Sequence, residues 1–187
     1  ANTSSRQLIG IYAQESGNGL NSVHNILFNS VRLSPTGISC QNSCFELGTT
    51  SGPVLQIYNN IFSNFTSAQT GNARHYCMVT PSGSYPGNAG SSSDHNDLYI
   101  ANAVNGFTGL TGTTNRATLA NWKNAFTPNQ DVSSFSQDPG FISSTDLHIA
   151  AGINTQLESG SLNISGLEFD IDSDTRPGPS GSTNGGG

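Results

Sequence analysis

Three aspartates alternate near the C-terminal end of the chain, at Asp170, Asp172 and Asp174. In an extended strand, alternating side chains point to the same side, and carboxylate oxygens placed in this way are the hard ligands that Ca²⁺ prefers. An EF-hand is excluded because its Gly at position six and its Glu at position twelve are both absent. The alternative to a calcium site is a solvated acidic turn, whose charge Arg176 neutralises in part.

A second titratable cluster comprises Asp94, His95 and Asp97. A carboxylate beside an imidazole is suited to general acid–base chemistry. However, His95 and His24 both open a similar stretch of sequence, His-Asn followed by apolar residues. An enzyme does not need its general base twice, so we favour a structural role for these residues at the end of a strand.

The basic residues do not support a polyanion site. A polysaccharide lyase needs Lys or Arg beside acidic residues, and a glycoside hydrolase needs a pair of carboxylates. The six basic residues are scattered along the chain: Arg6, Arg32, Arg74, Arg116, Lys123 and Arg176. With a net charge of −6 and no basic cluster, the chain is not expected to bind nucleic acid. No apolar run reaches about 18 residues, so no membrane insertion is expected.

A repeated stretch must position these side chains. His24–Val31 reads HNILFNSV, Asn59–Phe65 reads NNIFSNF and His95–Ile100 reads HNDLYI. The asparagines at 25, 60 and 96 are separated by 35 and 36 residues. A nearly constant period of this length is typical of a coiled repeat in which successive turns stack. We therefore predict that Asn25, Asn60 and Asn96 form a structural ladder, and that Ile26, Ile61 and Leu98 line one column.

A fainter series predicts a second family of strands. It reads GIYA at 10–13, CFEL at 44–47 and YCMV at 76–79. Ile11, Cys44 and Cys77 are 33 residues apart, which would place the two cysteines on neighbouring turns. The roughly 4.8 Å between strands makes a Cys44–Cys77 disulfide one candidate. A Cys40–Cys44 bridge and buried reduced thiols are the alternatives.

Composition favours an all-β fold. Gly, Ser, Thr and Asn make up 87 of the 187 residues, and only 10% are charged. Such turn-forming residues separate short β-branched and aromatic runs, which is typical of many short strands. We predict a domain over 1–177 with one short side helix near 116–126, strands that resume from Val132, and a flexible Gly/Ser-rich tail over 178–187.

Several further segments support a family resemblance: SDHNDLYIA, RATLANWKNAF, DVSSFSQDPGFISSTDLHI and DIDSDTRPG. With the repeats, they resemble the right-handed parallel β-helix modules of large cell-surface proteins of Bacteroidetes-type bacteria. The resemblance implies a right-handed parallel β-helix, or solenoid, with an irregular C-terminal cap. It also implies a secreted or surface location, and a rigid spacer, adhesive stalk or carbohydrate-contacting surface.

These observations favour a non-catalytic extracellular structural or adhesive module, with surface glycans or self-association into fibres as its partners. The alternative is an enzyme, a polysaccharide lyase or glycoside hydrolase of the β-helix type. No catalytic residue is assigned from the sequence, and calcium is the only candidate cofactor.

Overall fold

The computed structural model describes residues 8–14, 22–48, 53–67, 71–81, 90–150, 152, 156–158, 160–169 and 173. Within these residues the chain forms eleven strands, one α-helix and one short 3₁₀ helix. The predicted all-β class is therefore confirmed. Short strands are what the composition favours, because Gly, Asn and Ser interrupt each β-branched or aromatic run.

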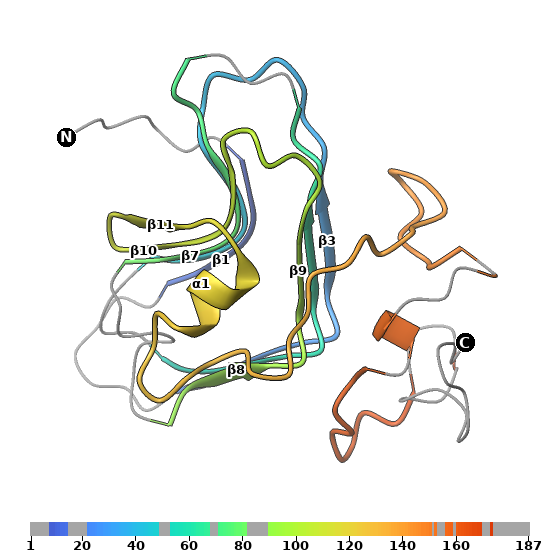
Figure 1. The fold of residues 1–187 in the computed structure, drawn as a ribbon. Coiled ribbons are helices and arrows are strands. Elements are labelled where there is room, and N and C mark those ends of the chain that lie inside the picture. Colours follow the sequence, from blue (N-terminus) through green and yellow to red (C-terminus); the bar gives the residue numbers. More distant parts are fainter. Residues whose placement is uncertain are drawn as a thin grey trace.

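The strands lie in three sheets, which surround a common core (Figure 1). The first sheet contains β1 (Leu8–Ala13), β4 (Asn42–Leu47), β7 (His75–Thr80), β10 (Gly106–Thr111) and β11 (Thr114–Arg116). The second contains β2 (Val23–Leu27), β5 (Val54–Tyr58) and β8 (Ser92–Asp94). The third contains β3 (Ser30–Leu33), β6 (Ile61–Asn64) and β9 (Asp97–Ile100). All pairs are parallel except β10–β11.

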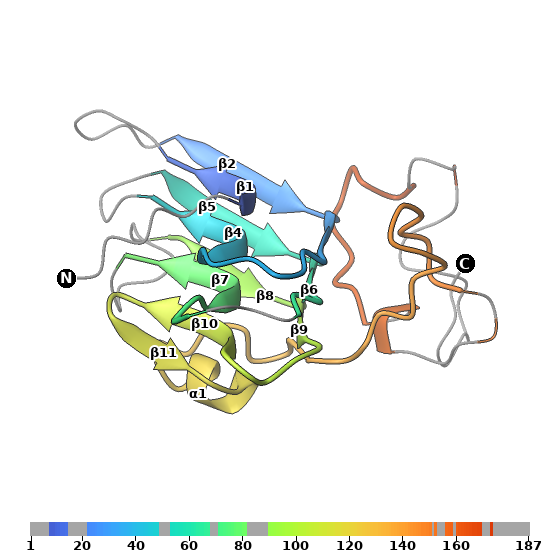
Figure 2. The ribbon, with the colours of Figure 1, turned by 90° about the horizontal axis from the view of Figure 1, so that it is seen from above.

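The chain visits the sheets in the same order on each turn, and successive turns lie one above another (Figure 2). There are three strand families, so the prediction of two was wrong. The reason is a corner inside the repeated stretch, where Phe28, Asn59 and His95 have positive φ of 55°, 58° and 55°. This left-handed backbone ends one strand and starts the next. HNILFNSV therefore supplies both β2 and β3.

The register places side chains of successive turns in rows. Ile11, Phe45, Met78 and Gly109 are in-register partners in the first sheet. The predicted column was wrong in its members: Ile26 pairs with Ile57, Ile61 with Asp97, and Leu98 with Phe62. Rows of apolar side chains do exist, but the corner shifts their alignment relative to the repeated letters.

A helix covers the last turn of the core. α1 (Leu119–Lys123) begins after Thr118, whose side chain accepts a hydrogen bond from the Asn121 amide. Trp122 is fully buried, and its ring occupies the space that a side chain at Gly109 would fill. The helix is shorter than the predicted 116–126: β11 extends to Arg116, Thr118 is the N-cap, and the helix ends at Lys123 with Asn124 as its C-cap.

The segment after the helix does not resume regular strands, contrary to prediction. The bridges Asp97–Phe135 and Phe141–Ile149 are isolated, and η1 (Gln156–Glu158) follows. The first part of the segment continues the stack along β8 and β9, where the Asp131 N–H donates to the Ser93 carbonyl and the Phe135 N–H to the Asn96 carbonyl. Only the later part lies outside the third sheet (Figure 1). Leu162 exchanges two hydrogen bonds of 2.8 Å with the Asn59 side chain. The predicted tail over 178–187 is outside the described residues.

Candidate functional site

A row of asparagines follows the corner between the second and third sheets. Asn29 Nδ2 donates to Asn60 Oδ1, and Asn60 Nδ2 donates to Asn96 Oδ1, both at 3.0 Å. Each accepting Oδ1 also receives the backbone N–H of the preceding asparagine at 3.0 Å. Because these groups are buried or half-buried, each bond also removes the cost of an unpaired polar group. The row therefore fixes the stacking of the turns.

The predicted ladder included Asn60 and Asn96 correctly but was wrong about Asn25. Asn25 is exposed in the middle of β2 and pairs with Gln56. Asn29, the second asparagine of HNILFNSV, occupies the corner instead. The first step of the row is 31 residues and the second is 36. A search for a constant period selects the wrong asparagine for this reason.

A fully buried carboxylate ends the row. Asp131 Oδ1 accepts hydrogen bonds from Asn96 Nδ2 at 3.1 Å, Ser93 Oγ at 2.9 Å and Ser134 Oγ at 2.8 Å. Its Oδ2 accepts the Trp122 Nε1–H at 2.7 Å. Four donors compensate the desolvation of the carboxylate. Asp131 thus connects the asparagine row to the helix that covers the core.

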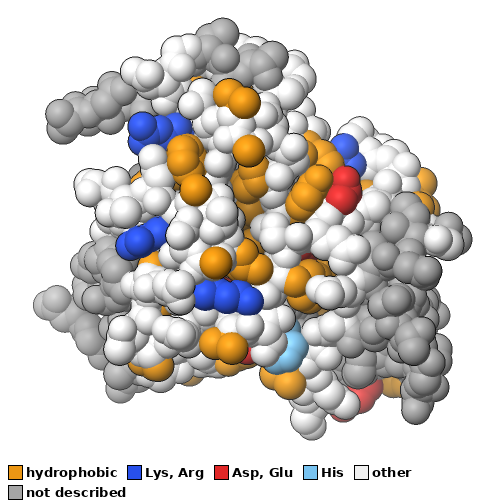
Figure 3. All heavy atoms as spheres, in the orientation of Figure 1, with side chains coloured by type: hydrophobic (Ala, Val, Ile, Leu, Met, Phe, Trp, Pro, Cys, Tyr) orange, Lys and Arg blue, Asp and Glu red, His pale blue; other side chains and the backbone are white. Residues whose placement is uncertain are grey.

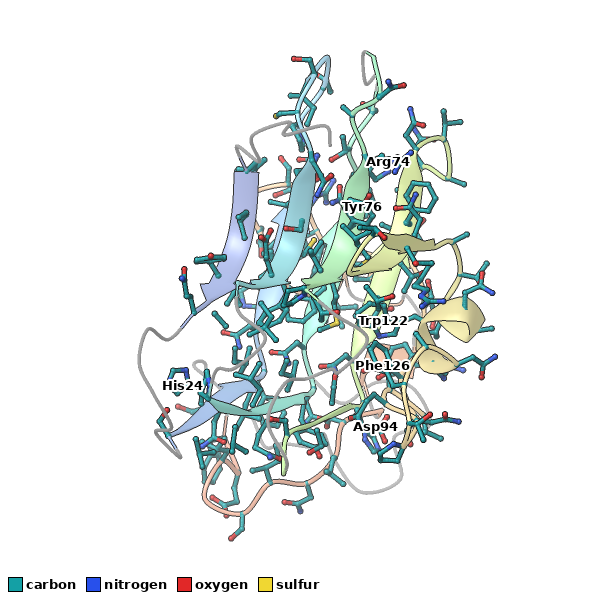
Figure 4. The ribbon with its side chains drawn as sticks, turned by 90° about the vertical axis from the view of Figure 1, so that its left-hand side faces the viewer. His24, Arg74, Tyr76, Asp94, Trp122 and Phe126 are labelled. Carbon is teal, nitrogen blue, oxygen red and sulfur yellow. The ribbon has the colours of Figure 1, made fainter. Side chains whose placement is uncertain are left out.

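The predicted cluster of Asp94, His95 and Asp97 does not assemble. His95 Nδ1 is 3.6 Å from Asp94 Oδ2 at a partly exposed corner, and neither residue hydrogen-bonds Asp97. His24 does not match His95 either, since it pairs with Leu55 inside a strand. Figure 4 shows His24 and Asp94 at opposite ends of the stack. This favours the structural interpretation of both histidines.

Asp97 instead belongs to an acidic pair on the outer side of the third sheet. Its side chain is fully buried, and Oδ1 accepts the Gln137 backbone N–H at 2.9 Å. Oδ2 is buried and has no hydrogen-bond partner. Asp138 follows Gln137, and its Oδ2 is 3.5 Å from the Tyr99 hydroxyl, which donates to it. Asp138 Oδ1 accepts the Gly140 N–H at 3.0 Å.

The pair is electrostatically strained. Burial raises the pKa of Asp97 to about 8, the Gln137 hydrogen bond opposes this, and the negative charge of Asp138 adds to it. Burial and both carboxylates also raise the pKa of Tyr99. At neutral pH Asp97 is therefore mostly protonated while Asp138 is exposed to solvent. Two carboxyl groups in such different environments are the usual arrangement for an acid–base pair.

The three cysteines are free thiols, so the candidate Cys44–Cys77 disulfide is not present. The two residues do occupy in-register positions on neighbouring strands, as predicted. However, Cys44 Sγ donates to the Ser63 carbonyl at 3.4 Å and Cys77 Sγ to the Tyr99 carbonyl at 3.3 Å. Burial raises the pKa of both thiols, which keeps them protonated and unreactive.

The predicted calcium ligands Asp170, Asp172 and Asp174 lie outside the described residues. Within the described part of the chain, no group of three or more His, Cys, Asp or Glu side chains is arranged to hold a metal ion. In the same residues, no helix has the length and apolar character needed to cross a membrane.

Sequence reasoning missed Asp131 and Asp138. Asp131 was hidden because it follows the helix and belongs to no repeated stretch. It could have been sought as the terminal acceptor that a row of asparagines needs. Asp138 lies in the quoted segment SFSQDPGF, where Asp-Pro-Gly indicates a turn. Its proximity to Asp97 depends on a bridge between residues 97 and 135 that no local pattern indicates.

Comparisons with protein-family models, with curated proteins and with solved structures found no match to this chain. Its function must therefore be inferred from its own residues and their chemistry.

Proposed function

We propose that this chain is a short right-handed parallel β-helix that serves as a non-catalytic extracellular structural or adhesive module. Each turn adds one strand to each of three sheets, as a coiled repeat would. The family resemblance of the sequence supports a secreted or cell-surface location.

The asparagine row is the observation that carries the proposal. Asn29, Asn60, Asn96 and Asp131 are joined into one chain of hydrogen bonds that crosses three successive contacts between turns. Every side-chain oxygen and nitrogen of Asn60, Asn96 and Asp131 has a hydrogen-bond partner within the row, on a neighbouring side chain or on the backbone. Such groups stabilise a stack and leave no donor or acceptor for a substrate.

The ends and surface of the stack support a role in assembly. β1, β2 and β3 each lie at the edge of their sheet, with a strand partner on one side among the described residues. Unpaired strand edges favour pairing with further strands. Figure 3 shows one face on which charged side chains are few and lie apart, among scattered hydrophobic side chains, so little charge repulsion opposes close contact. Self-association into fibres and contact with surface glycans are both consistent with this surface.

Turnover assays test the proposal directly. The protein is incubated with acidic and neutral polysaccharides, and new reducing ends and unsaturated products are measured. A structural module gives no more product than a boiled sample. Product formation that Asp97→Asn abolishes would overturn the proposal, while sedimentation at increasing concentration separately tests self-association.

The second candidate is a glycoside hydrolase, which the Asp97–Asp138 pair favours. Asp97 holds a proton at neutral pH and could act as a general acid, while exposed Asp138 could act as the base or nucleophile. Against this, Asp97 is fully buried and could reach a sugar only if the segment after α1 moves. Parallel loss of turnover in Asp97→Asn and Asp138→Asn would support the enzyme.

A further inference from the structure

We propose that Asp97 and Asp138 bind a Ca²⁺ ion between the third sheet and the segment that follows α1. This site is separate from the alternating aspartates at 170, 172 and 174. It does not depend on the function proposed for the module.

Each carboxylate uses one oxygen for the backbone and leaves the other for a ligand. Asp97 Oδ1 accepts the Gln137 N–H and Asp138 Oδ1 accepts the Gly140 N–H. These bonds fix both carboxylate groups in position. Asp97 Oδ2 is left fully buried with no partner, and Asp138 Oδ2 has one long contact of 3.5 Å with the Tyr99 hydroxyl. A buried acceptor with no donor is costly and calls for a partner.

No positive charge of the described chain meets this need. Neither carboxylate forms an ion pair with a described Lys or Arg. Arg32, on β3 of the same sheet, is directed at other groups: its guanidinium lies 4.2 Å from the Phe65 ring centroid and its Nη1 donates to the Ser143 carbonyl, while its Nε has no hydrogen-bond partner. The charge that acts on Asp97 is the negative charge of Asp138, which raises the pKa of Asp97. A cation is therefore the partner that would relieve the repulsion.

The ligand chemistry selects a hard divalent cation. The atoms available to coordinate an ion are carboxylate oxygens and the Tyr99 hydroxyl oxygen, with no nitrogen or sulfur ligand. Ca²⁺ accepts such oxygen ligands in flexible geometry and completes its shell with water. Because Asp138 is exposed, water can reach the ion. Few protein ligands imply weak binding, of the order of 10⁻⁴–10⁻³ M, as in extracellular modules.

The ion would also have a mechanical consequence. Asp97 belongs to β9, whereas Asp138 belongs to the segment beyond the helix, joined to β9 by the isolated Asp97–Phe135 bridge. A Ca²⁺ ion held by both would attach this irregular segment to the stack. Calcium would thus stabilise the cover of the third sheet.

Thermal unfolding with and without calcium tests the site. The full chain is melted in chelator, in millimolar CaCl₂ and in millimolar MgCl₂, as wild type, Asp97→Asn, Asp138→Asn and a triple Asp170→Asn/Asp172→Asn/Asp174→Asn variant. We expect Ca²⁺ at several times its Kd to raise the wild-type Tm by about 2–4 °C. The triple variant should keep this shift, and each single variant should lose most of it.

Each other outcome contradicts the site. A wild type whose Tm is the same in chelator and in calcium has no such ion. A shift that is lost in the triple variant and kept in Asp97→Asn places calcium elsewhere. Asp138 is exposed, so Asp138→Asn should fold normally and provides a second, independent test of the site. An unchanged calcium shift in Asp138→Asn would therefore overturn the proposal by itself.

Discussion

Asp131 and Asp97 are both fully buried aspartates, but their surroundings differ sharply. Asp131 lies under the helix and receives four hydrogen bonds, including one from Trp122. Asp97 lies under the irregular segment and receives one, from the Gln137 amide. Its second oxygen has no partner.

The two sites differ in whether the fold supplies enough hydrogen-bond donors for a buried carboxyl group. At Asp131 the fold supplies donors to both carboxyl oxygens, four in all, so no buried acceptor is left unpaired. At Asp97 the fold supplies too few donors, and the carboxyl keeps its proton or acquires a cation. The buried carboxyl at the helix-covered end of the stack thus has all its hydrogen bonds, whereas the one on the outer side of the third sheet lacks a partner for one oxygen.

Removal of Trp122 should have the largest effect. Trp122→Ala leaves a cavity beneath Gly109 and removes a donor from Asp131, so we expect a loss of about 3–5 kcal/mol in the free energy of unfolding. Trp122→Phe keeps most of the apolar contact and should lose less. Denaturant unfolding measures both. If Trp122→Phe is as stable as wild type, the hydrogen bond to Asp131 contributes nothing.

The asparagine row provides the next comparison. Asn60→Ala removes the Asn60 Oδ1 acceptor from both the Asn29 Nδ2 and the Asn29 backbone N–H, and removes one of the two donors to Asn96 Oδ1. It should cost about 2–3 kcal/mol. Asn25→Ala is a matched control, because Asn25 is exposed on β2. It should change stability by less than about 0.5 kcal/mol. Equal losses in the two variants would show that the row has no special role.

Stability should depend on pH through Asp97. The pKa of this carboxyl is raised from 3.8 to about 8 in the folded protein, so the folded chain binds a proton that the unfolded chain releases. In chelator, this contribution is fully present below about pH 4 and is lost as pH rises toward 8. Asp97→Asn should lack it. Urea titrations across this range compare the two slopes, and identical slopes would refute the assignment.

Much of the fold could be predicted from the sequence, because repeated letters report repeated environments. The all-β class, the stacking of successive turns and a short helix beside the repeats all follow from local patterns. The positions of Asn60, Asn96, Cys44 and Cys77 on successive turns also follow. Similar residues recur because the equivalent positions of successive turns have similar neighbours.

The remainder depends on contacts that are not repeated. The corner at Phe28, Asn59 and His95 divides one apparent strand into two. For this reason the predicted ladder contained Asn25 in place of Asn29, and the predicted column wrongly aligned Ile26 with Ile61. Asp131 and the segment at Gln137–Asp138 form their hydrogen bonds with residues about 35–40 positions earlier in the chain. A local sequence pattern cannot show which side-chain oxygen accepts the last hydrogen bond of a row, or which one is left without a partner.

The most direct test compares Asp131→Asn with Asp97→Asn by denaturant unfolding at pH 7 in chelator. Asparagine resembles the protonated acid already present at Asp97, so Asp97→Asn should be as stable as wild type or more so. At Asp131 the amide group would oppose an existing donor, and stability should fall by about 2–3 kcal/mol. Equal losses, or a larger loss at Asp97, would contradict the distinction between the two buried carboxylates.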